Sequence, residues 1–291
     1  MLAPRSLPAR LHQWNRRWRV PEGLATLENL KVLHGMFWRQ RARRVGPFAF
    51  QLNNSTRIVE YAWAFHVAPV IKGLRVVDIG GGLSGLQFVL AREGAHVINV
   101  DPFEEYGGRD YEDALRLVAL HSRLNRAFRT RVDLIQATLP HAGLADGSLD
   151  RIYSISVFEH LTPDARQATM AAIRRVLRPG GHVVLTLDLF LDLEPFTGEP
   201  VNRFGRNVSV AEMVDAAGLD LAWGRRDQLF GYPEFDVEAV RSRLQNLYVG
   251  HLYPCLAQLL VLRKPGPAGA TSALCPDVLA LDETTNDGAR A

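Results

Sequence analysis

The chain has 291 residues, 47% of them hydrophobic and 22% charged, and a formal net charge of +3. This length is sufficient to bury a core without disulfide or metal staples, and the composition excludes a collagen-like or wholly disordered chain. The sequence contains neither a membrane-spanning apolar run nor the apolar core of a secretory signal, and Cys255 and Cys275 fit no disulfide framework or metal-binding spacing. We therefore expect a cytoplasmic protein without a membrane span.

The start of the chain is strongly basic. Residues 1–50 contain nine arginines and one lysine against two glutamates, a net charge of +8, whereas the remaining residues carry −5. Such a segment can bind nucleic acid, phospholipid or a phosphorylated substrate. A solvated helix face is the simpler interpretation, because no recognition motif with interleaved aromatic residues accompanies the charge.

Helical patterns continue to about residue 70. Apolar residues at helical spacing predict a helix over Leu24–Arg44 that packs onto the domain or covers its mouth, and Ser55 is a suitable N-cap for a second helix. The apolar stripe consists of Leu27, Leu30, Leu33 and Phe37. We therefore predict that residues 1–70 form a helical, basic N-terminal extension or lid.

Short strand-like runs alternate with helical periodicity from Leu74 to about Leu262. This alternation predicts a parallel sheet with crossover helices, and the last two strands are expected to close the sheet as an antiparallel pair. The fold class is thus α/β, with a doubly wound, Rossmann-like sheet of seven strands that is mostly parallel. The expected strands are Leu74–Asp78, His96–Asp101, Val132–Gln136, Asp150–Val157, His182–Leu187, Leu219–Trp223 and Cys255–Leu262, and the expected helices are Ser84–Arg92, Tyr111–Leu124, Pro163–Leu177 and Ser209–Ala217.

The domain itself is expected to span residues 71–264. Residues 228–254 form an insertion between the last two strands, and their aromatic side chains predict a substrate lid. Residues 265–291 are rich in Ala, Gly, Thr and Asp, so we expect them to form a mostly disordered tail.

The turn after the first expected strand is the most informative segment. It reads Asp78-Ile79-Gly80-Gly81-Gly82-Leu83-Ser84-Gly85, and glycines at such a turn let the backbone bend sharply and let a ligand approach the main chain. Asp101 closes the next strand, where a carboxylate can accept hydrogen bonds from both hydroxyls of a ribose. The glycine spacing also satisfies G-x-G-x-x-G, so a dinucleotide site and an NAD-dependent oxidoreductase are an alternative.

Asp78 distinguishes the two cofactor classes. A pyrophosphate beside this turn would be repelled by the carboxylate, whereas the sulfonium and ammonium groups of S-adenosylmethionine are cationic. Asp78 therefore favours S-adenosylmethionine, the alternative being that it only caps the turn.

These segments together resemble the class I S-adenosylmethionine-dependent methyltransferases, within them the type-11 group that acts mostly on small molecules. The resemblance covers about residues 74–187 and rests on Asp78–Gly82, Asn99–Asp101, Phe158–Leu161 and Arg178–Gly181, which follow the family's order and spacing. It implies that the sheet is of the methyltransferase type and that S-adenosyl-L-methionine is held by Asp78, Gly80, Gly81, Gly82, Asp101, Pro102, Gln136, Ala137 and Val157.

Two positions depart from the family pattern. Ser84 replaces the usual third glycine, so the turn near the methionine end can have a different shape. Gln136 stands where the family usually has an aspartate for the adenine amino group, and its carbonyl can still accept that hydrogen bond.

The resemblance implies displacement at the sulfonium methyl group by an O, N, C or S nucleophile of a small-molecule acceptor. A base is needed only if the nucleophile is protonated at neutral pH. His160 is the first candidate because it follows the fourth strand and can titrate near pH 7, and Asp188 and Glu159 are the others. No cluster of His, Cys and Asp suggests a metal.

Acceptor recognition is expected in the variable segments. The candidates are Tyr61, Trp63 and Phe65, the loop 190–207 with Arg203 and Arg206, and the insertion with Phe230, Tyr232, Phe235, Tyr248 and Tyr253. The same aromatic residues could equally pack the helices of a lid. The sequence identifies neither the acceptor nor an oligomeric state.

Two further alternatives remain. An RNA-modifying methyltransferase could use the basic first 50 residues to hold phosphates, although Val157-Phe158-Glu159-His160 stands where base amino-group methyltransferases have Asn/Asp-Pro-Pro-Tyr/Phe. A non-catalytic cofactor-binding fold that acts as a partner protein is the other, and the intact cofactor motifs weigh against it.

Overall fold

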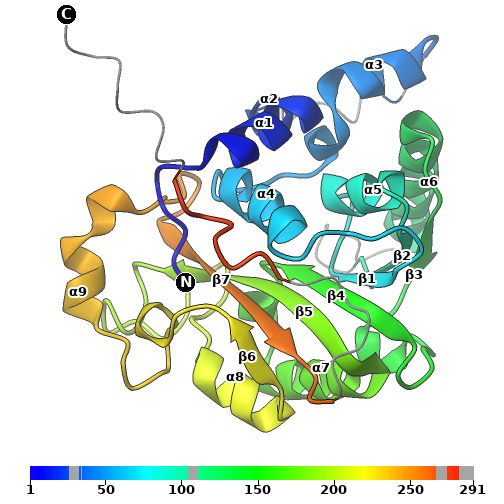
Figure 1. Ribbon diagram of the computed structural model, residues 1–291. Coiled ribbons are helices and arrows are strands. Elements are labelled where there is room, and N and C mark those ends of the chain that lie inside the picture. Colours follow the sequence, from blue (N-terminus) through cyan, green and yellow to red (C-terminus); the bar gives the residue numbers. More distant parts are fainter. Residues whose placement is uncertain (26–32, 34, 104–110, 267–273, 282–291) are drawn as a thin grey trace, which may run out of the picture.

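The computed structural model describes residues 1–25, 33, 35–103, 111–266 and 274–281, with the backbone alone for 111–115. Its centre is a seven-stranded sheet, and Figure 1 shows helices on both sides of it. The strands are β1 (Arg75–Ile79), β2 (His96–Val100), β3 (Val132–Ile135), β4 (Leu149–Ile155), β5 (Leu177–Phe190), β6 (Asp220–Trp223) and β7 (Cys255–Arg263). The helices are α1 (Ala9–Trp18), α2 (Val20–Ala25), α3 (Trp38–Val45), α4 (Arg57–Val67), α5 (Gly85–Arg92), α6 (Tyr111–Phe128), α7 (Pro163–Val176), α8 (Val210–Ala217) and α9 (Val237–Ser242).

The strand order is β3-β2-β1-β4-β5-β7-β6. Strands β1 to β5 pair in parallel, whereas β7 runs antiparallel to both β5 and β6. The predicted Rossmann-like sheet, mostly parallel and closed by an antiparallel pair, is therefore confirmed. The strand order reverses between β1 and β4, which is the position where ligands bind in sheets of this kind.

Alternate residues of each strand face opposite layers of helices, as the two-residue period of a strand requires. Val76 and Val184 belong to the core under α1, α4, α5 and α6, whereas their neighbours Val77 and Val183 belong to the core under α7 and α8. The central strands are apolar on both faces because both faces are covered.

Side-chain caps fix the starts of several crossover helices. Ser84 accepts a hydrogen bond from the amide of Leu86, so the residue that departs from the family's glycine pattern is the N-cap of α5. Thr162 caps α7 in the same way, with Pro163 in its first turn.

The helix predicted over Leu24–Arg44 is wrong. Helix α2 ends at Ala25 and α3 begins only at Trp38, after Phe37, which has a left-handed backbone (φ 65°) and is 62% exposed. Leu33 is buried as expected, and Leu27 and Leu30 lie outside the described residues. Ser55 is not an N-cap either: α4 starts at Arg57, and the preceding turn is built on Asn54, whose Oδ1 accepts from the amides of Ser55 and His251.

Part of the predicted disordered tail is ordered. Residues 274–281 pack against the N-terminal helices, with Val278 fully buried and the Cys275 amide donating to the carbonyl of Val67. Arg10 donates to the carbonyl of Val278, which ties this segment to α1. The composition of the tail did not reveal these few apolar anchors.

Candidate cofactor and acceptor site

The predicted cofactor residues meet at the carboxyl edge of the parallel strands. The glycine turn follows β1, Asp101 and Pro102 follow β2, and Gln136 and Ala137 follow β3. Val157, beyond β4, closes the other side of the turn: a methyl group on Gly80 would lie 2.6 Å from Val157 Cγ2. The sheet topology thus brings these residues together at the point where the strand order reverses.

The glycines of the turn are required by its geometry. Gly80 and Gly82 have positive φ values of 64° and 50°. A methyl group on Gly81 would lie 2.7 Å from Asp78 Oδ2 and 2.8 Å from Asn99 Oδ1. A side chain at any of these positions would therefore strain the backbone or displace its polar neighbours.

Side chains from neighbouring elements hold the turn in place. Asn99 Nδ2 donates to the carbonyl of Gly82 at 2.9 Å, and Gln87 Nε2 donates to the same oxygen at 3.1 Å. Asp101 Oδ2 accepts from the Gly82 amide at 2.7 Å, while its Oδ1 accepts from the amide of Phe103 at 2.6 Å. The acid expected to bind ribose hydroxyls thus also fixes the backbone beside them.

Asp78 is buried, and its Oδ2 has no hydrogen-bond partner among the described residues. Burial, and secondarily the negative charge of Asp101, raises the pKa of Asp78 to about 8. An unpartnered carboxylate in this position would be stabilised by a cation. The turn therefore fits a ligand that carries positive charge, as S-adenosylmethionine does, and fits a pyrophosphate poorly.

Gln136 lies exposed at the carboxyl end of β3. Its side chain makes no hydrogen bond to another described residue, so its carbonyl and amide groups can contact a ligand at the sheet edge. Ala137 and Pro102 are half-buried beside it.

A second polar cluster lies at the ends of β4 and β5. The Arg57 guanidinium pairs with Glu60, which lies one helical turn away in α4, and with Asp188 Oδ1 at 3.4 Å. The Tyr253 hydroxyl donates to Asp188 Oδ2 at 2.8 Å, and Ser156 Oγ donates to Asp188 Oδ1 at 3.3 Å. The Asp188 carboxylate, at the end of β5, thus contacts both the start of α4 and the end of the insertion.

The cluster contains more carboxyl groups than cations. Glu159 is 1% exposed; its Oε1 accepts from the Asp188 amide at 2.9 Å, and its Oε2 has no partner among the described residues. Burial, followed by the charge of Asp188, raises the pKa of Glu159 well above its usual range, and burial also raises the pKa of Glu60. Burial thus disfavours the charged form of both glutamic acids, and the nearby Arg57 guanidinium opposes this effect in each.

His160 is the most accessible of the three predicted catalytic residues. It is half-buried at the end of a short 3-10 helix, η4 (Phe158–His160), and its Nδ1 donates to the carbonyl of Phe204. That bond fixes a tautomer in which Nε2 is the acceptor nitrogen. The Phe204 ring packs on Tyr253 with ring centroids 4.1 Å apart, so His160 adjoins the cluster around Asp188 through the loop 190–207.

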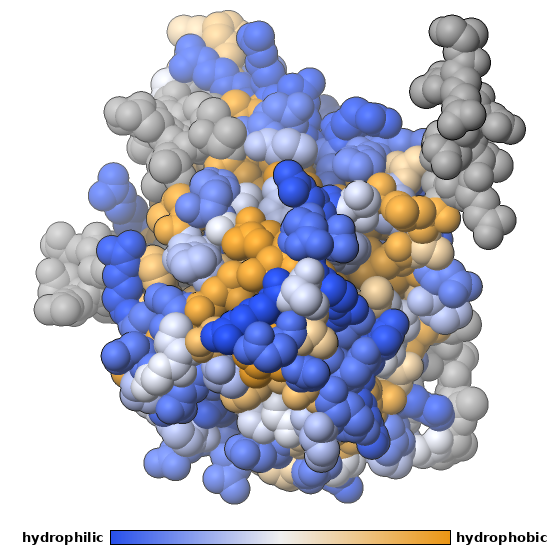
Figure 2. Space-filling model, turned by 90° about the vertical axis from the view of Figure 1, so that its left-hand side faces the viewer, coloured by the Kyte–Doolittle hydropathy of each residue, from blue (hydrophilic) through white to orange (hydrophobic). Residues whose placement is uncertain are grey.

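Several predicted acceptor contacts are instead packing residues. Tyr61 and Trp63 are buried and pack on Phe48 and Trp223, with ring centroids 4.7 and 5.2 Å apart respectively. The loop and the insertion do expose Val201, Val249 and Leu252. Figure 2 shows the side of the molecule on which α9 lies, where hydrophobic and hydrophilic side chains are interspersed.

Sequence reasoning assigned no role to several polar residues of these two clusters. They include Gln87, His121 and the Asn99 side chain beside the glycine turn, and Arg57 and Glu60 beside Asp188. The available signal was polarity inside apolar segments, as for Asn99 in His-Val-Ile-Asn-Val.

Two classes of structure are absent from the described part of the chain. It has no group of three or more His, Cys, Asp or Glu side chains that could hold a metal ion. It also has no helix with the length and apolar character needed to cross a bilayer.

Comparison with known proteins supports the interpretation of the site. Residues 77–185, from the middle of β1 into β5, match the family described as "Methyltransferase domain". Residues 77–185 therefore form a methyltransferase domain. The matched segment contains every predicted cofactor residue and, of the catalytic candidates, Glu159 and His160.

The curated relatives share a moderate identity with the chain over part of their length. The ubiquinone biosynthesis O-methyltransferase of Pectobacterium atrosepticum is 34% identical over 163 residues, 50% of this chain and 62% of that protein. The one from Erwinia tasmaniensis is 32% identical over 122 residues, 42% of this chain and 45% of that protein. An uncharacterized methyltransferase of Mycolicibacterium gilvum is 27% identical over 179 residues. The chain thus spans less than two thirds of the length of these relatives.

Solved structures share the fold at low sequence identity. The [4+2]-cyclase SpnF has a TM-score of 0.52 and 16% identity, covering 90% of this chain and 100% of SpnF. A methyltransferase of Bacillus halodurans described as putative has a TM-score of 0.51 and 14% identity, covering 71% of this chain and 99% of its own. Since one neighbour is described as a cyclase, the fold alone does not fix the reaction.

Proposed function

We propose that this protein transfers the methyl group of S-adenosyl-L-methionine to a small-molecule acceptor. The observation that carries the proposal is the buried Oδ2 of Asp78 beside the glycine turn, which has no hydrogen-bond partner among the described residues. A cationic methyl donor supplies the missing partner, whereas a dinucleotide would place phosphate charge against this acid. Asp101 would then hold the ribose hydroxyls, and Gln136 the adenine amino group.

The acceptor side of the proposed site is the region between His160 and the cluster around Asp188. When bound, the cofactor supplies an electrophilic methyl group for in-line displacement. Holding the nucleophile in line can lower such a barrier by on the order of 7–11 kcal/mol. Tyr253, Asp188 and Arg57 are joined by hydrogen bonds across three elements, so they form a rigid wall suited to positioning an acceptor.

His160 is the proposed general base among the three candidates. Asp188 and Glu159 are fully buried and bonded within the cluster, so we assign them to positioning rather than to proton transfer. His160 is partly accessible, and its Nε2 remains free to accept a proton from the acceptor while Nδ1 stays on Phe204.

We further propose that the acceptor atom is a hydroxyl oxygen. Two of the relatives named above are described as O-methyltransferases, and a hydroxyl is protonated at neutral pH. It is therefore a nucleophile that benefits from a base such as His160. Small phenols, catechols among them, are the acceptors to test first.

Calorimetric titration with S-adenosylhomocysteine and with NAD tests the cofactor assignment. We expect saturable binding of S-adenosylhomocysteine at one site per chain and no binding of NAD. Transfer of labelled methyl from S-adenosylmethionine to a panel of phenols, amines and thiols then tests the reaction. Tight NAD binding without S-adenosylhomocysteine binding would overturn the proposal, as would cofactor binding with no transfer across the panel.

A further inference from the structure

Five arginines line a cavity of about 240 Å³, and none of the predicted cofactor or catalytic residues lines it. They are Arg17, Arg19, Arg43, Arg92 and Arg129. They come from the end of α1, the end of α3, the end of α5 and the residue after α6, so four helices direct their C-terminal ends to one place. Arg17, Arg19 and Arg43 belong to the basic first 50 residues, which the proposed methyl transfer does not use.

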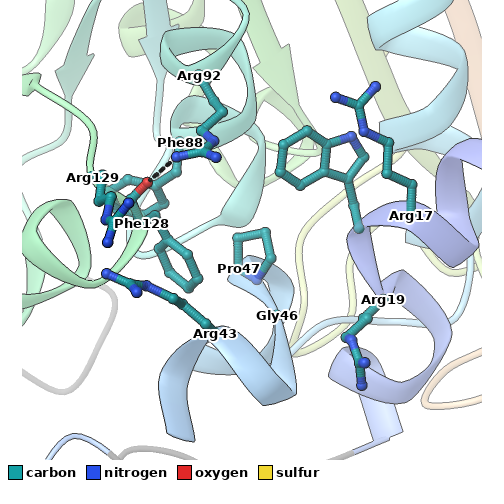
Figure 3. A pocket seen from close by; sticks show the side chains of 10 residues that line it. Arg17, Arg19, Arg43, Gly46, Pro47, Phe88, Arg92, Phe128 and Arg129 are labelled. Atoms are coloured by element: carbon teal, nitrogen blue, oxygen red, sulfur yellow. Dashed lines mark hydrogen bonds between the residues drawn. The ribbon is translucent and has the colours of Figure 1, made fainter. Parts of the chain in front are cut away.

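Three of these arginines lie on one side of the cavity, around the end of α6. Arg43 Nε donates to the carbonyl of Ala127 at 2.6 Å, and Arg92 Nη1 donates to the carbonyl of Phe128 at 3.2 Å. Arg129 follows directly in the chain. Figure 3 shows Arg43, Arg92 and Arg129 grouped around Phe128, with Arg17 and Arg19 on the other side.

Compensation of helix ends explains only part of this charge. Cations near a helix C-terminus are stabilising, and the bonds of Arg43 and Arg92 to the last carbonyls of α6 are of this type. In the part of the chain that the structure describes, Arg19 and Arg129 make no such bond. Within the described residues the single carboxylate paired with the five arginines is Glu93, 3.1 Å from Arg17 Nη2.

The floor of the cavity is apolar and contains aromatic rings. Pro47, which begins the 3-10 helix η2 (Pro47–Phe50), lies in Figure 3 between the two groups of arginines, and Phe88 and Phe128 line the cavity beside it. The Phe88 and Phe128 rings pack on each other with centroids 5.7 Å apart. Trp18 adds a further ring to the lining. Such a floor suits a planar ring, which arginine can also stack upon.

We propose that this cavity binds a phosphorylated small molecule that carries a planar ring, the chemistry of a nucleoside phosphate. Guanidinium groups match phosphate oxygens as bidentate donors, and the group of Arg43, Arg92 and Arg129 offers several at one point. The volume is slightly below the roughly 300–1,000 Å³ of pockets for drug-sized ligands, so it suits one ring with its phosphate better than a polymer. A phosphate would also relieve the repulsion among the three guanidinium groups.

The test is calorimetric titration of the full-length chain with ADP, adenosine and inorganic pyrophosphate. Saturating S-adenosylhomocysteine is present to fill the proposed cofactor site, and 150 mM salt limits long-range attraction. We expect one ADP per chain, with adenosine and pyrophosphate each bound at least tenfold more weakly. Arg129→Gln should weaken ADP binding at least fivefold, and the double variant R43Q/R129Q at least thirtyfold.

The matched control is the double variant R41Q/R44Q, which removes the same amount of charge from α3, the helix of Arg43, without altering the lining of the cavity. It should change ADP affinity less than threefold. Because Arg129 makes no hydrogen bond or ion pair within the described residues, R129Q should keep the melting temperature and the S-adenosylhomocysteine affinity of the unmodified chain. These readouts separate failure of this proposal from failure of the cofactor assignment.

Three results would overturn the proposal. The first is equal loss of ADP binding in the control and in R43Q/R129Q, which would indicate a diffuse electrostatic effect. The second is pyrophosphate binding as tight as ADP binding, which would show that the apolar floor has no role. The third is tenfold tighter binding of a 5′-phosphorylated oligoribonucleotide, which would identify a nucleic-acid surface instead.

Discussion

His121 Nε2 lies 2.9 Å from Oε1 of Gln87, within the core that supports the glycine turn. Burial lowers the pKa of His121 to about 4, so at neutral pH the ring is uncharged and donates to Gln87. The amide nitrogen of Gln87 in turn donates to the carbonyls of Gly81 and Gly82. A histidine in α6 therefore helps to hold the backbone that would contact the cofactor.

Gln87→Leu should weaken cofactor binding without removing any group that touches the ligand. The change leaves the His121 N–H without a partner and removes one donor from the Gly81 and Gly82 carbonyls, and each buried unsatisfied group costs about 1–3 kcal/mol. We expect about a tenfold loss of S-adenosylhomocysteine affinity by calorimetry and a lower melting temperature. Gln245→Leu, on an exposed side chain, is the control and should change neither. Unaltered S-adenosylhomocysteine affinity in the Gln87 variant would show that Gln87 does not help to position the glycine turn for binding.

Binding of S-adenosylmethionine should release a proton from Asp78. Because its pKa is raised to about 8, Asp78 is largely protonated near pH 6.5 in the free protein, and a cationic ligand favours the ionised form. Calorimetry at pH 6.5 in buffers of different ionisation enthalpy should give close to one proton released, and affinity should rise from pH 6 to 7.5. Asp78→Asn should abolish both effects. No proton release in the unmodified protein would contradict the assignment.

Asp78 should also lower the stability of the folded protein as pH rises, whereas the affinity for the cofactor rises over the same range. A raised folded-state pKa contributes stability that is fully present below the unfolded value of 3.8 and is lost as pH rises through about 8. The free energy of unfolding of the unmodified chain, compared with that of Asp78→Asn, should therefore fall between pH 5 and pH 9. Denaturant titrations at several pH values measure this difference, and a pH-independent difference would count against it.

Removing Arg57 should strongly destabilise the protein. Its guanidinium is buried between Glu60 and Asp188, and deleting one partner of a buried pair costs about 3–5 kcal/mol because the remaining charge is left unpaired. Arg57→Met keeps much of the side-chain volume and isolates the charge effect. Arg175→Met removes an exposed pair with Asp146 and should cost less than about 1 kcal/mol. If denaturant unfolding gave similar losses in the free energy of unfolding for the two variants, the buried ion pairs of Arg57 would contribute no more to stability than an exposed pair.

His160→Ala should reduce turnover by roughly 10²–10⁴ if His160 acts as the base, with little change in S-adenosylhomocysteine affinity. His160→Gln can retain a hydrogen bond to the Phe204 carbonyl without being able to accept a proton at neutral pH. Both variants should therefore lose activity. A fall of less than threefold would remove His160 from this role.

The features that sequence predicted well are those encoded locally. Runs of Val, Ile and Leu placed all seven strands, and residues at the ends of β1 to β4 converge because the carboxyl ends of parallel strands share an edge. The contact between Arg57 and Asp188 joins residues 131 positions apart and depends on where α4 sits, which no local pattern specifies. The order of residues 274–281 likewise depends on a surface supplied by α1 and α4.

Helix α4 lies between the two halves of the candidate site. Arg57 and Glu60 in its first turn belong to the acceptor side. Tyr61 of the same helix packs on Phe48. Phe48 in turn contacts Gly85, at the start of α5, so closely that a methyl group on Gly85 would lie 2.7 Å from the Phe48 ring. Helix α4 thus contacts both regions. If acceptor binding shifts α4 and changes the affinity for the cofactor, thermodynamic linkage requires the cofactor to change the affinity for the acceptor by the same factor. The stability of the ternary complex would then be the same whichever substrate binds first.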